Sequence, residues 1–327
     1  MVLSHLEIVG TGSYLPQDIR GNDYFSGIVL WKHDAAGKEL EHRVLNPEGI
    51  FQVTGIRERR YARSDEHPSD MGYNAAVRAL EKSGVSADSV AGIIVATVSE
   101  KVNFPSAACK IQKRLGIRGC FAYDIQNACA GFPEALIEAD ARAYRADGGN
   151  YLVIASEKLS AHTDITDINA TLFGDGAGAV VLHHSESGKG IVATYSVSDP
   201  FDGIDSLIFR NSENCIWMPD GGAVMKLAVR NMLESARFLK ERAGWDRADV
   251  YIPHQANGRI LDAVEKRVTD KGAVVYKNIE KYGNMSSATC AVALDESVCN
   301  GTVKEGSRVI ITSFGSGLVT AGVAVQF

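Results

Sequence analysis

Short apolar runs alternate along this chain with longer stretches whose apolar residues recur every three or four positions. Residues Ala91–Thr97 form a continuous β-rich run, which is typical of a strand buried on both faces. Residues Ser69–Ser83 instead place Met71, Ala75 and Leu80 on one face of a helix. Further strands are expected at Leu6–Gly10, Gly119–Ile125, Tyr151–Ser156, Val250–Pro253, Arg308–Thr312 and Val319–Phe327, and further helices at Ser106–Leu115, Pro133–Arg145 and Ala223–Arg242. Helices that alternate with buried strands predict an α/β fold.

The chain divides into two stretches of similar pattern. From about Gly190 the second stretch repeats the order of the first: a strand, a long irregular segment, a helix, and then further strands and helices. This parallel favours an internally duplicated fold, with an N-terminal half at residues 1–186 and a C-terminal half at residues 187–327. Residues 21–49 are irregular and polar, with scattered Gly and Pro, and predict a long loop.

Composition describes an ordinary soluble globular protein. The chain has 327 residues, of which 45% are hydrophobic and 23% charged, and its net charge of −6 gives no support to general nucleic-acid binding. No apolar run approaches the length of a membrane span, and the first residues do not resemble a secretion signal. The six cysteines are dispersed without the spacing of a metal site, which favours free thiols in a reducing compartment and predicts a cytoplasmic protein without a bound metal.

One cysteine lies in a turn that suits a nucleophile. Cys129 is flanked by small residues, after the strand expected at Gly119–Ile125 and before the helix expected at Pro133–Arg145. The unpaired N–H groups at the start of a helix favour negative charge, so this turn predicts a thiol that ionises more readily than usual. Cysteine is also among the most buried residue types, and an isolated one is more often a small core residue. Residues further along the chain decide between the two interpretations.

Two further turns carry polar groups at comparable positions. His254 follows the strand expected at Val250–Pro253, and Asn284 lies in a turn of small residues. Each is weak alone, because a single histidine is more often a satisfied polar residue and Gly-Asn is a common turn pair. Together with Cys129 they match thioester chemistry, in which a thiolate accepts an acyl group and two neutral donors hold the carbonyl oxygen as it becomes negative.

The glycine-rich segment 174–182 invites a nucleotide-binding interpretation. It lacks the Lys-Ser/Thr ending of a phosphate loop, and its glycines precede a strand instead of a helix. Close packing of a turn and a strand is the favoured interpretation.

Seven short motifs are spread over nearly the whole chain. They read GTGSYLP at residues 10–16, TGIRER at 54–59, FPSAAC at 104–109, ACAGF at 128–132, FGDGAG at 173–178, PHQAN at 253–257 and GN at 283–284. In combination they resemble the β-ketoacyl-acyl-carrier-protein synthase III family of condensing enzymes, within the thiolase superfamily. The resemblance implies a duplicated five-layer αβαβα subunit, a homodimer, and Cys129, His254 and Asn284 as the catalytic residues.

The resemblance also implies a mechanism with supporting residues. An acyl group moves from a thioester donor to Cys129, and a malonyl thioester then loses CO₂ and attacks it, while His254 and Asn284 hold the enolate oxygen. The substrates are acyl-coenzyme A or acyl-carrier protein and a malonyl thioester, with no permanently bound cofactor, in fatty-acid or polyketide-like metabolism. Further implied positions are an oxyanion hole at the backbone of Cys129 and Ser316, an acyl pocket at Phe104, Phe314 and Leu318, and carrier-protein docking at Lys226, Arg259 and Lys266. Phe104 could equally be ordinary interface packing, and the three basic residues a solvated surface.

The chain departs from the family where coenzyme A binds. The adenine-stacking aromatic of the family is missing from residues 47–50, and the arginine expected opposite it falls at Ile168 and Asn169. The region 25–46 is longer than usual, and its Trp31 could substitute for the missing ring. These differences predict that acyl-carrier protein or another donor is preferred to coenzyme A.

Three other functions stay open at this stage. Cys129 could pass its acyl group to an alcohol or an amine, or the enzyme could condense without decarboxylation. The latter needs a carboxylate base, for which Glu100 is the candidate, although a surface glutamate is its commoner role. A catalytically silent acyl-binding partner is disfavoured, because Cys129, His254 and Asn284 are all present.

Overall fold

The chain builds two five-stranded sheets. The computed structural model describes residues 5–102, 104–146, 149–200 and 207–327. In spatial order the first sheet contains β1 (His5–Tyr14), β9 (Asp175–Ser185), β8 (Asn150–Lys158), β6 (Val90–Ala96) and β7 (Phe121–Ile125). The second contains β10 (Gly190–Ser198), β16 (Val319–Gln326), β15 (Arg308–Gly315), β13 (Val250–Pro253) and β14 (Val274–Val275). The strands expected from the apolar runs all lie in these two sheets.

Both sheets have one topology. In each, the first strand in sequence pairs antiparallel with the fifth, and the fifth pairs antiparallel with the fourth. The fourth then pairs parallel with the second, and the second pairs parallel with the third. Because the repeated strand order is specific, it establishes the internal duplication that the sequence pattern favours. The strand sets separate between Ser185 and Gly190, while the division into halves 1–186 and 187–327 stays a prediction.

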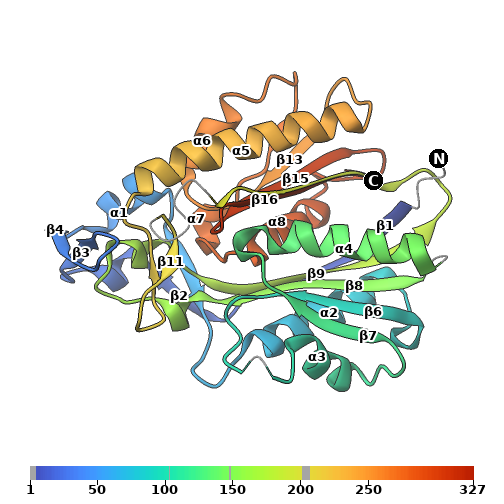
Figure 1. Cartoon of the computed structure of the whole chain (residues 1–327), viewed down its shortest axis with the longest axis horizontal. Coiled ribbons are helices and arrows are strands. Elements are labelled where there is room, and N and C mark those ends of the chain that lie inside the picture. The colour runs from blue at the N-terminus through green and yellow to red at the C-terminus, as the bar shows by residue number, and fades with distance from the viewer. Residues whose placement is uncertain (1–4, 103, 147–148, 201–206) are drawn as a thin grey trace.

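Helices complete a five-layer arrangement, which Figure 1 shows from the side. α4 (Gly131–Ala146) and α8 (Ala288–Cys299) lie between the sheets, α2 (Pro68–Ser83) and α3 (Ala107–Leu115) cover the first sheet, and α5 (Gly221–Arg242) and α6 (Gly258–Glu265) cover the second. α8 is buried around most of its circumference, as expected of a helix enclosed by two sheets. The four helices expected from periodicity begin within one or two residues of their observed starts.

The loop expected over residues 21–49 is wrong, because this region folds into defined elements. It contains a 3-10 turn at Asn22–Phe25, the antiparallel hairpin of β3 (Leu30–His33) and β4 (Glu39–Arg43), and the start of α1 (Pro47–Thr54). Every residue of β4 is exposed, so the hairpin lacks the alternation of apolar and polar positions by which a strand is recognised.

The remaining elements are short. They are β2 (Asp18–Gly21), β5 (Glu58–Tyr61), β11 (Phe209–Arg210), β12 (Ile216–Trp217), α7 (Ile279–Tyr282) and 3-10 turns at Ala87–Ser89, Ala128–Ala130, Leu159–His162 and Ile168–Leu172. Within the described ranges, no helix combines the length and the apolar character that crossing a membrane requires.

The glycine-rich segment 174–182 serves close packing, as the sequence predicts. Most of it forms β9, and α8 lies directly against it. A Cβ atom at Gly178 would lie 2.5 Å from the Ala291 Cβ atom and 2.7 Å from the Ala291 carbonyl carbon. Since backbone cannot retreat cheaply in a packed core, only glycine permits this contact between the first sheet and the central layer.

Replacement of this glycine should therefore destabilise the fold. We expect Gly178→Ala to lower the free energy of unfolding by about 1–3 kcal/mol, because the added methyl overpacks the β9–α8 contact. Urea denaturation followed by circular dichroism measures the change. The control is Gly221→Ala at the first residue of α5, where a Cβ atom would meet nothing within 4 Å. An equal loss in both variants would contradict the packing argument.

Candidate active site

Cys129 lies where a strand of the first sheet turns into a helix of the central layer. β7 ends at Ile125, a 3-10 turn covers Ala128–Ala130, and α4 begins at Gly131. Ala128 has a left-handed φ of 45°, a conformation that is costly for a residue with a side chain and clusters at functional turns. The expected strand-to-helix turn at Cys129 is confirmed.

The end of β15 packs against the backbone of this turn. Ser313 Oγ donates a hydrogen bond to the carbonyl oxygen of Cys129 at 2.7 Å. A Cβ atom at Gly315 would lie 2.7 Å from the Cys129 nitrogen, so a side chain at residue 315 would prevent this approach. The candidate nucleophile, carried by the first sheet, is thereby held against the second sheet.

His254 follows β13 and is buried, with 2% of its surface exposed. Its Nδ1 lies 2.6 Å from Thr289 Oγ1, and the Thr289 hydroxyl donates to the carbonyl oxygen of Ser286 at 2.9 Å. The single hydroxyl proton is used in that second bond, so Nδ1 is the donor in the first. Burial lowers the pKa of His254 to about 3, which keeps the ring neutral. The neutral ring therefore carries its proton on Nδ1 and leaves Nε2 as an acceptor.

Asn284 is oriented by the turn that follows it. Its Oδ1 accepts a hydrogen bond from the Ser286 backbone nitrogen at 2.8 Å. Ser286 has a left-handed φ of 46°, so this turn is also strained. With its oxygen engaged, Asn284 presents its NH₂ group as the free end of the amide.

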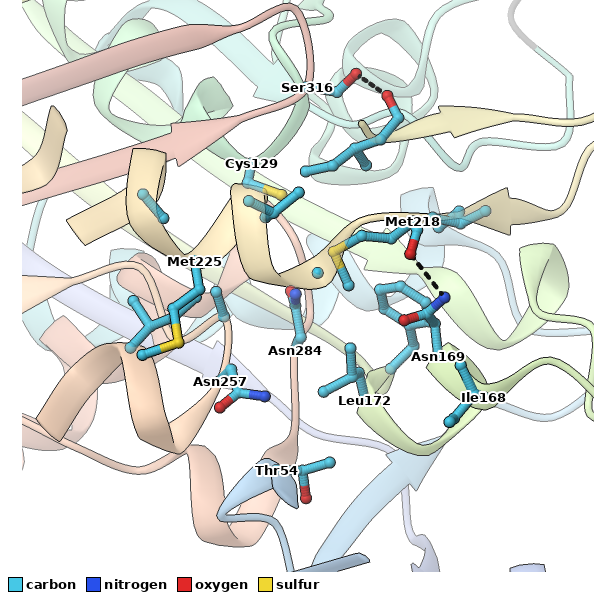
Figure 2. A pocket seen from close by; sticks show the side chains of 18 of the residues that line it. Thr54, Cys129, Ile168, Asn169, Leu172, Met218, Met225, Asn257, Asn284 and Ser316 are labelled. Carbon is cyan, nitrogen blue, oxygen red and sulfur yellow. Dashed lines mark hydrogen bonds between the residues drawn. The ribbon is translucent and has the colours of Figure 1, made fainter. Parts of the chain in front are cut away.

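These three residues line one cavity of about 620 Å³. Figure 2 shows the side chains of Cys129 and Asn284 entering it from different segments, with Met218 and Met225 close by. Its apolar walls come from both halves of the chain and include Leu159, Leu172, Phe173, Ile208, Phe209, Met218, Val224, Met225, Ala228, Ile260 and Phe314. Sequence reasoning missed most of these residues. Helical spacing on α5 predicts a buried face, but it does not predict that this face lines a cavity.

The thiol of Cys129 is not activated in the free protein. Burial raises the pKa of Cys129 to about 11, with the Glu157 carboxylate adding to the rise and a hydrogen bond with Ser286 opposing it. The expectation of a readily ionised thiol is therefore wrong here. Removal of the sulfur from water outweighs the favourable N–H groups at the start of the helix.

Glu157 is a buried acid that sequence reasoning missed. It ends the apolar run of β8 and accepts hydrogen bonds from Ser99 Oγ at 2.6 Å, Ser287 Oγ at 2.7 Å and the Val98 nitrogen at 3.1 Å. Burial raises its pKa despite these donors. An acidic residue close behind the apolar run Tyr151–Ala155 is the feature that could have identified it.

Comparison with known proteins places this arrangement in a family. The family model described as 3-oxoacyl-[acyl-carrier-protein] synthase III matches residues 123–200, and the model of its C-terminal region matches residues 240–327. A β-ketoacyl-[acyl-carrier-protein] synthase III from Oceanobacillus iheyensis is 38% identical over 330 residues, which cover 99% of each chain. The chain belongs to this family.

A solved synthase III structure has the same fold as this chain. The crystal structure of 3-oxoacyl-[acyl-carrier-protein] synthase III from Aquifex aeolicus VF5 matches with a TM-score of 0.89 at 35% identity, covering 98% of this chain and 100% of that one. The expected duplicated αβαβα fold of the thiolase superfamily is confirmed.

The pocket positions implied by the synthase III resemblance fall in three places. Phe314 lines the cavity, as does Ser316, which the resemblance implies for the oxyanion hole and not for the acyl pocket. Leu318 packs in the same apolar cluster as Phe314 but is not part of the cavity wall. Phe104 is 90% exposed and lies away from the cavity of the single chain.

Of the implied docking residues and the candidate carboxylate base, only Arg259 lines the cavity. Lys226, Arg259 and Lys266 are exposed at α5 and α6, and Arg259 also lines the cavity. A surface position is the commoner role for a glutamate, but Glu100 is buried. It accepts hydrogen bonds from Lys110 Nζ at 3.0 Å and from the Ser69 nitrogen at 2.9 Å. It does not line the cavity, so the synthase III site holds no carboxylate at the expected position.

Trp31, the candidate substitute for the missing adenine-stacking ring, lies on the β3–β4 hairpin outside the cavity wall. Its side chain packs on His42, with ring centroids 4.7 Å apart, and it is not among the cavity residues, whereas Ile168 and Asn169 are. No group of His, Cys, Asp and Glu side chains that could hold a metal ion occurs in the part of the chain that the structure describes.

The raised pKa of Cys129 gives a direct test of the site's electrostatics. Alkylation of Cys129 by iodoacetamide should rise with pH along a titration curve whose midpoint is near 11, because only the thiolate of this half-buried side chain reacts. Peptide-level mass spectrometry across a pH series measures labelling at Cys129 separately from the other cysteines. Far-UV circular dichroism at each pH checks that the protein stays folded. A midpoint at or below the ordinary value of about 8.5 would contradict this electrostatic account.

Proposed function

We propose that the chain catalyses decarboxylative Claisen condensation between an acyl group carried on Cys129 and a malonyl thioester. The observation that carries this proposal is the convergence of Cys129, His254 and Asn284 on one largely apolar cavity in a synthase III family member. Such a cavity lowers the effective dielectric, so that fixed hydrogen-bond donors act strongly on developing charge.

The first step transfers the acyl group. The Cys129 sulfur bonds to the thioester carbonyl carbon, and the bond from that carbon to the donor sulfur breaks. Backbone N–H groups of Cys129 and Ser316 hold the oxyanion that forms between these events. The thiol proton passes through His254 Nε2 to the departing sulfur, so the donor leaves as a thiol and the His254 ring returns to its neutral form.

The second step decarboxylates the malonyl thioester. The bond to the carboxylate breaks, CO₂ leaves, and the electron pair forms an enolate. Its oxygen accepts hydrogen bonds from Asn284 and from His254, whose Nε2 takes a proton from water as this charge develops. Burial alone holds the pKa of His254 near 3, so the ring keeps a proton only beside a negative partner such as this enolate. The enolate carbon attacks the acyl carbonyl, and the released Cys129 sulfur recovers its proton from His254.

The partners follow from the surface near the cavity. We propose that acyl-carrier protein docks at Lys226, Arg259 and Lys266, whose exposed cations suit an acidic partner. A second copy of the chain covers Phe104 in a homodimer, since such exposure is unusual for a large aromatic side chain. All six cysteines are free, which supports location in the cytoplasm.

Covalent loading is the most direct consequence of the proposal. Incubation with the donor thioester should add one acyl mass to the wild-type protein and none to Cys129→Ser, because only the sulfur nucleophile is removed. Intact-protein mass spectrometry measures the adduct. Cys109→Ser is the control, since Cys109 is exposed outside the cavity, and it should still load fully. An adduct that persists in Cys129→Ser would refute the role of this residue.

The two steps should also separate by mutation. We expect His254→Ala and Asn284→Ala to lower malonyl decarboxylation by about 10²–10³-fold, the usual effect of losing one oxyanion donor, while self-acylation falls less. Acyl transfer and CO₂ release are assayed separately. His183→Ala, at an exposed histidine of β9, should change neither rate. Equal losses in both steps would show that the donors serve acyl transfer as much as decarboxylation.

A further inference from the structure

The β3–β4 hairpin is fixed beside the entrance to the cavity. In Figure 1 it lies outside the five layers, next to α1 and the β11–β12 ribbon. The Trp31 nitrogen donates to the carbonyl oxygen of Thr166 at 2.6 Å, and His33 Nδ1 lies 3.1 Å from the buried Asp167 carboxylate. The His33 ring stacks on Trp217 with centroids 4.8 Å apart and planes 3° from parallel. These contacts hold the hairpin in one position.

Anchoring and cavity contacts use opposite faces of this hairpin. Lys32 is directly opposite Glu41 in the strand register, and Arg43 follows on the same face as Glu41 because alternate residues share a face. All three line the cavity that also contains Cys129. His33 belongs to the other face, where its ring makes the contacts with Asp167 and Trp217. The hairpin therefore presents charged side chains to the cavity from a rigid support.

The charge of the cavity is opposite in sign to that of the chain. Among the described residues, Lys32, Arg43, Arg210 and Arg259 are the basic residues that line it, and Glu41 is the single acidic one. The whole chain carries a net charge of −6. Glu41 lies 3.8 Å from Lys32 Nζ and 3.1 Å from Arg43 Nη2, and all three side chains are well exposed. Such exposed pairs are weak, so an incoming anion can exchange with Glu41.

We propose that Lys32 and Arg43 form a binding site for the phosphate of a phosphopantetheine thioester. This inference rests on the proposed function, because such thioesters are the substrates there. A phosphate pairs well with an arginine fork and a lysine point charge. Acyl-coenzyme A and acyl-carrier protein share this phosphate, and no aromatic ring of the hairpin lines the cavity to stack on adenine. The hairpin thus recognises the common arm of both donors.

Direct binding tests the site independently of catalysis. Isothermal titration compares 4′-phosphopantetheine with pantetheine, which lacks the phosphate. The wild type should bind the phosphorylated arm about tenfold or more tightly, as expected for charge-assisted hydrogen bonds, and Lys32→Gln with Arg43→Gln should remove the difference without weakening pantetheine. Lys38→Gln is the control, because Lys38 is exposed on the same hairpin but does not line the cavity. Equal affinity for the two compounds in the wild type would overturn the proposal.

Acylation of Cys129 then distinguishes the sources of the phosphate. The double variant should slow loading from acyl-coenzyme A and from acyl-carrier protein by similar factors and leave loading from acyl-pantetheine unchanged. A loss confined to acyl-coenzyme A would assign the two residues to its adenosine phosphates and overturn recognition of the shared arm. An equal loss with acyl-pantetheine would mean that the hairpin acts structurally. Failure of every donor to load Cys129 would refute the proposed function, while the titration still decides the binding site.

Discussion

The close contact between the Cys129 turn and the end of β15 is the constraint on which the active site depends. It joins the first sheet to the second through the Ser313 hydrogen bond and the bare backbone at Gly315. A second link comes from Ser287, whose hydroxyl donates to the carbonyl oxygen of Ala96 at 3.2 Å. Cys129, the proposed nucleophile, belongs to one duplicated half, and His254 and Asn284 belong to the other, so the cavity that all three line forms where the halves meet. The fold therefore creates the site at its internal interface.

The electrostatics of this interface favour neutral groups until substrate arrives. Burial raises the pKa of Cys129 and lowers that of His254, so neither residue carries charge in the free protein. In the proposed mechanism the thioester supplies the negative charge that a proton on His254 balances, and Asn284 donates without titrating. The positive charges of the cavity are instead carried by exposed lysine and arginine side chains in its lining, where contact with water reduces the free-energy cost of holding charge. On the proposed function, the site separates recognition of an anionic arm from chemistry in an apolar interior.

Sequence patterns predict what depends on local order, and they fail where long-range burial decides. Periodicity predicts helices in all three helical layers. Small neighbouring residues mark the turns of Cys129 and Asn284, and the end of an apolar run marks the position of His254. The β3–β4 hairpin was not predicted, because its residues show no clear alternation of apolar and polar positions and its position depends on contacts with distant residues such as Asp167 and Trp217. The sequence predicts a lowered pKa for Cys129 because it shows the neighbouring helix. It does not show the loss of water around the sulfur, which raises the pKa.

The stoichiometry of carbon loss tests the central claim most directly. The protein is supplied with an acyl donor and a malonyl thioester labelled with ¹³C in its free carboxylate, and labelled CO₂ and β-ketoacyl product are quantified together. Decarboxylative condensation predicts one labelled CO₂ for each β-ketoacyl thioester and no label in the product. Product that retains the carboxylate label, or acyl transfer to an alcohol or amine without CO₂, would contradict the account.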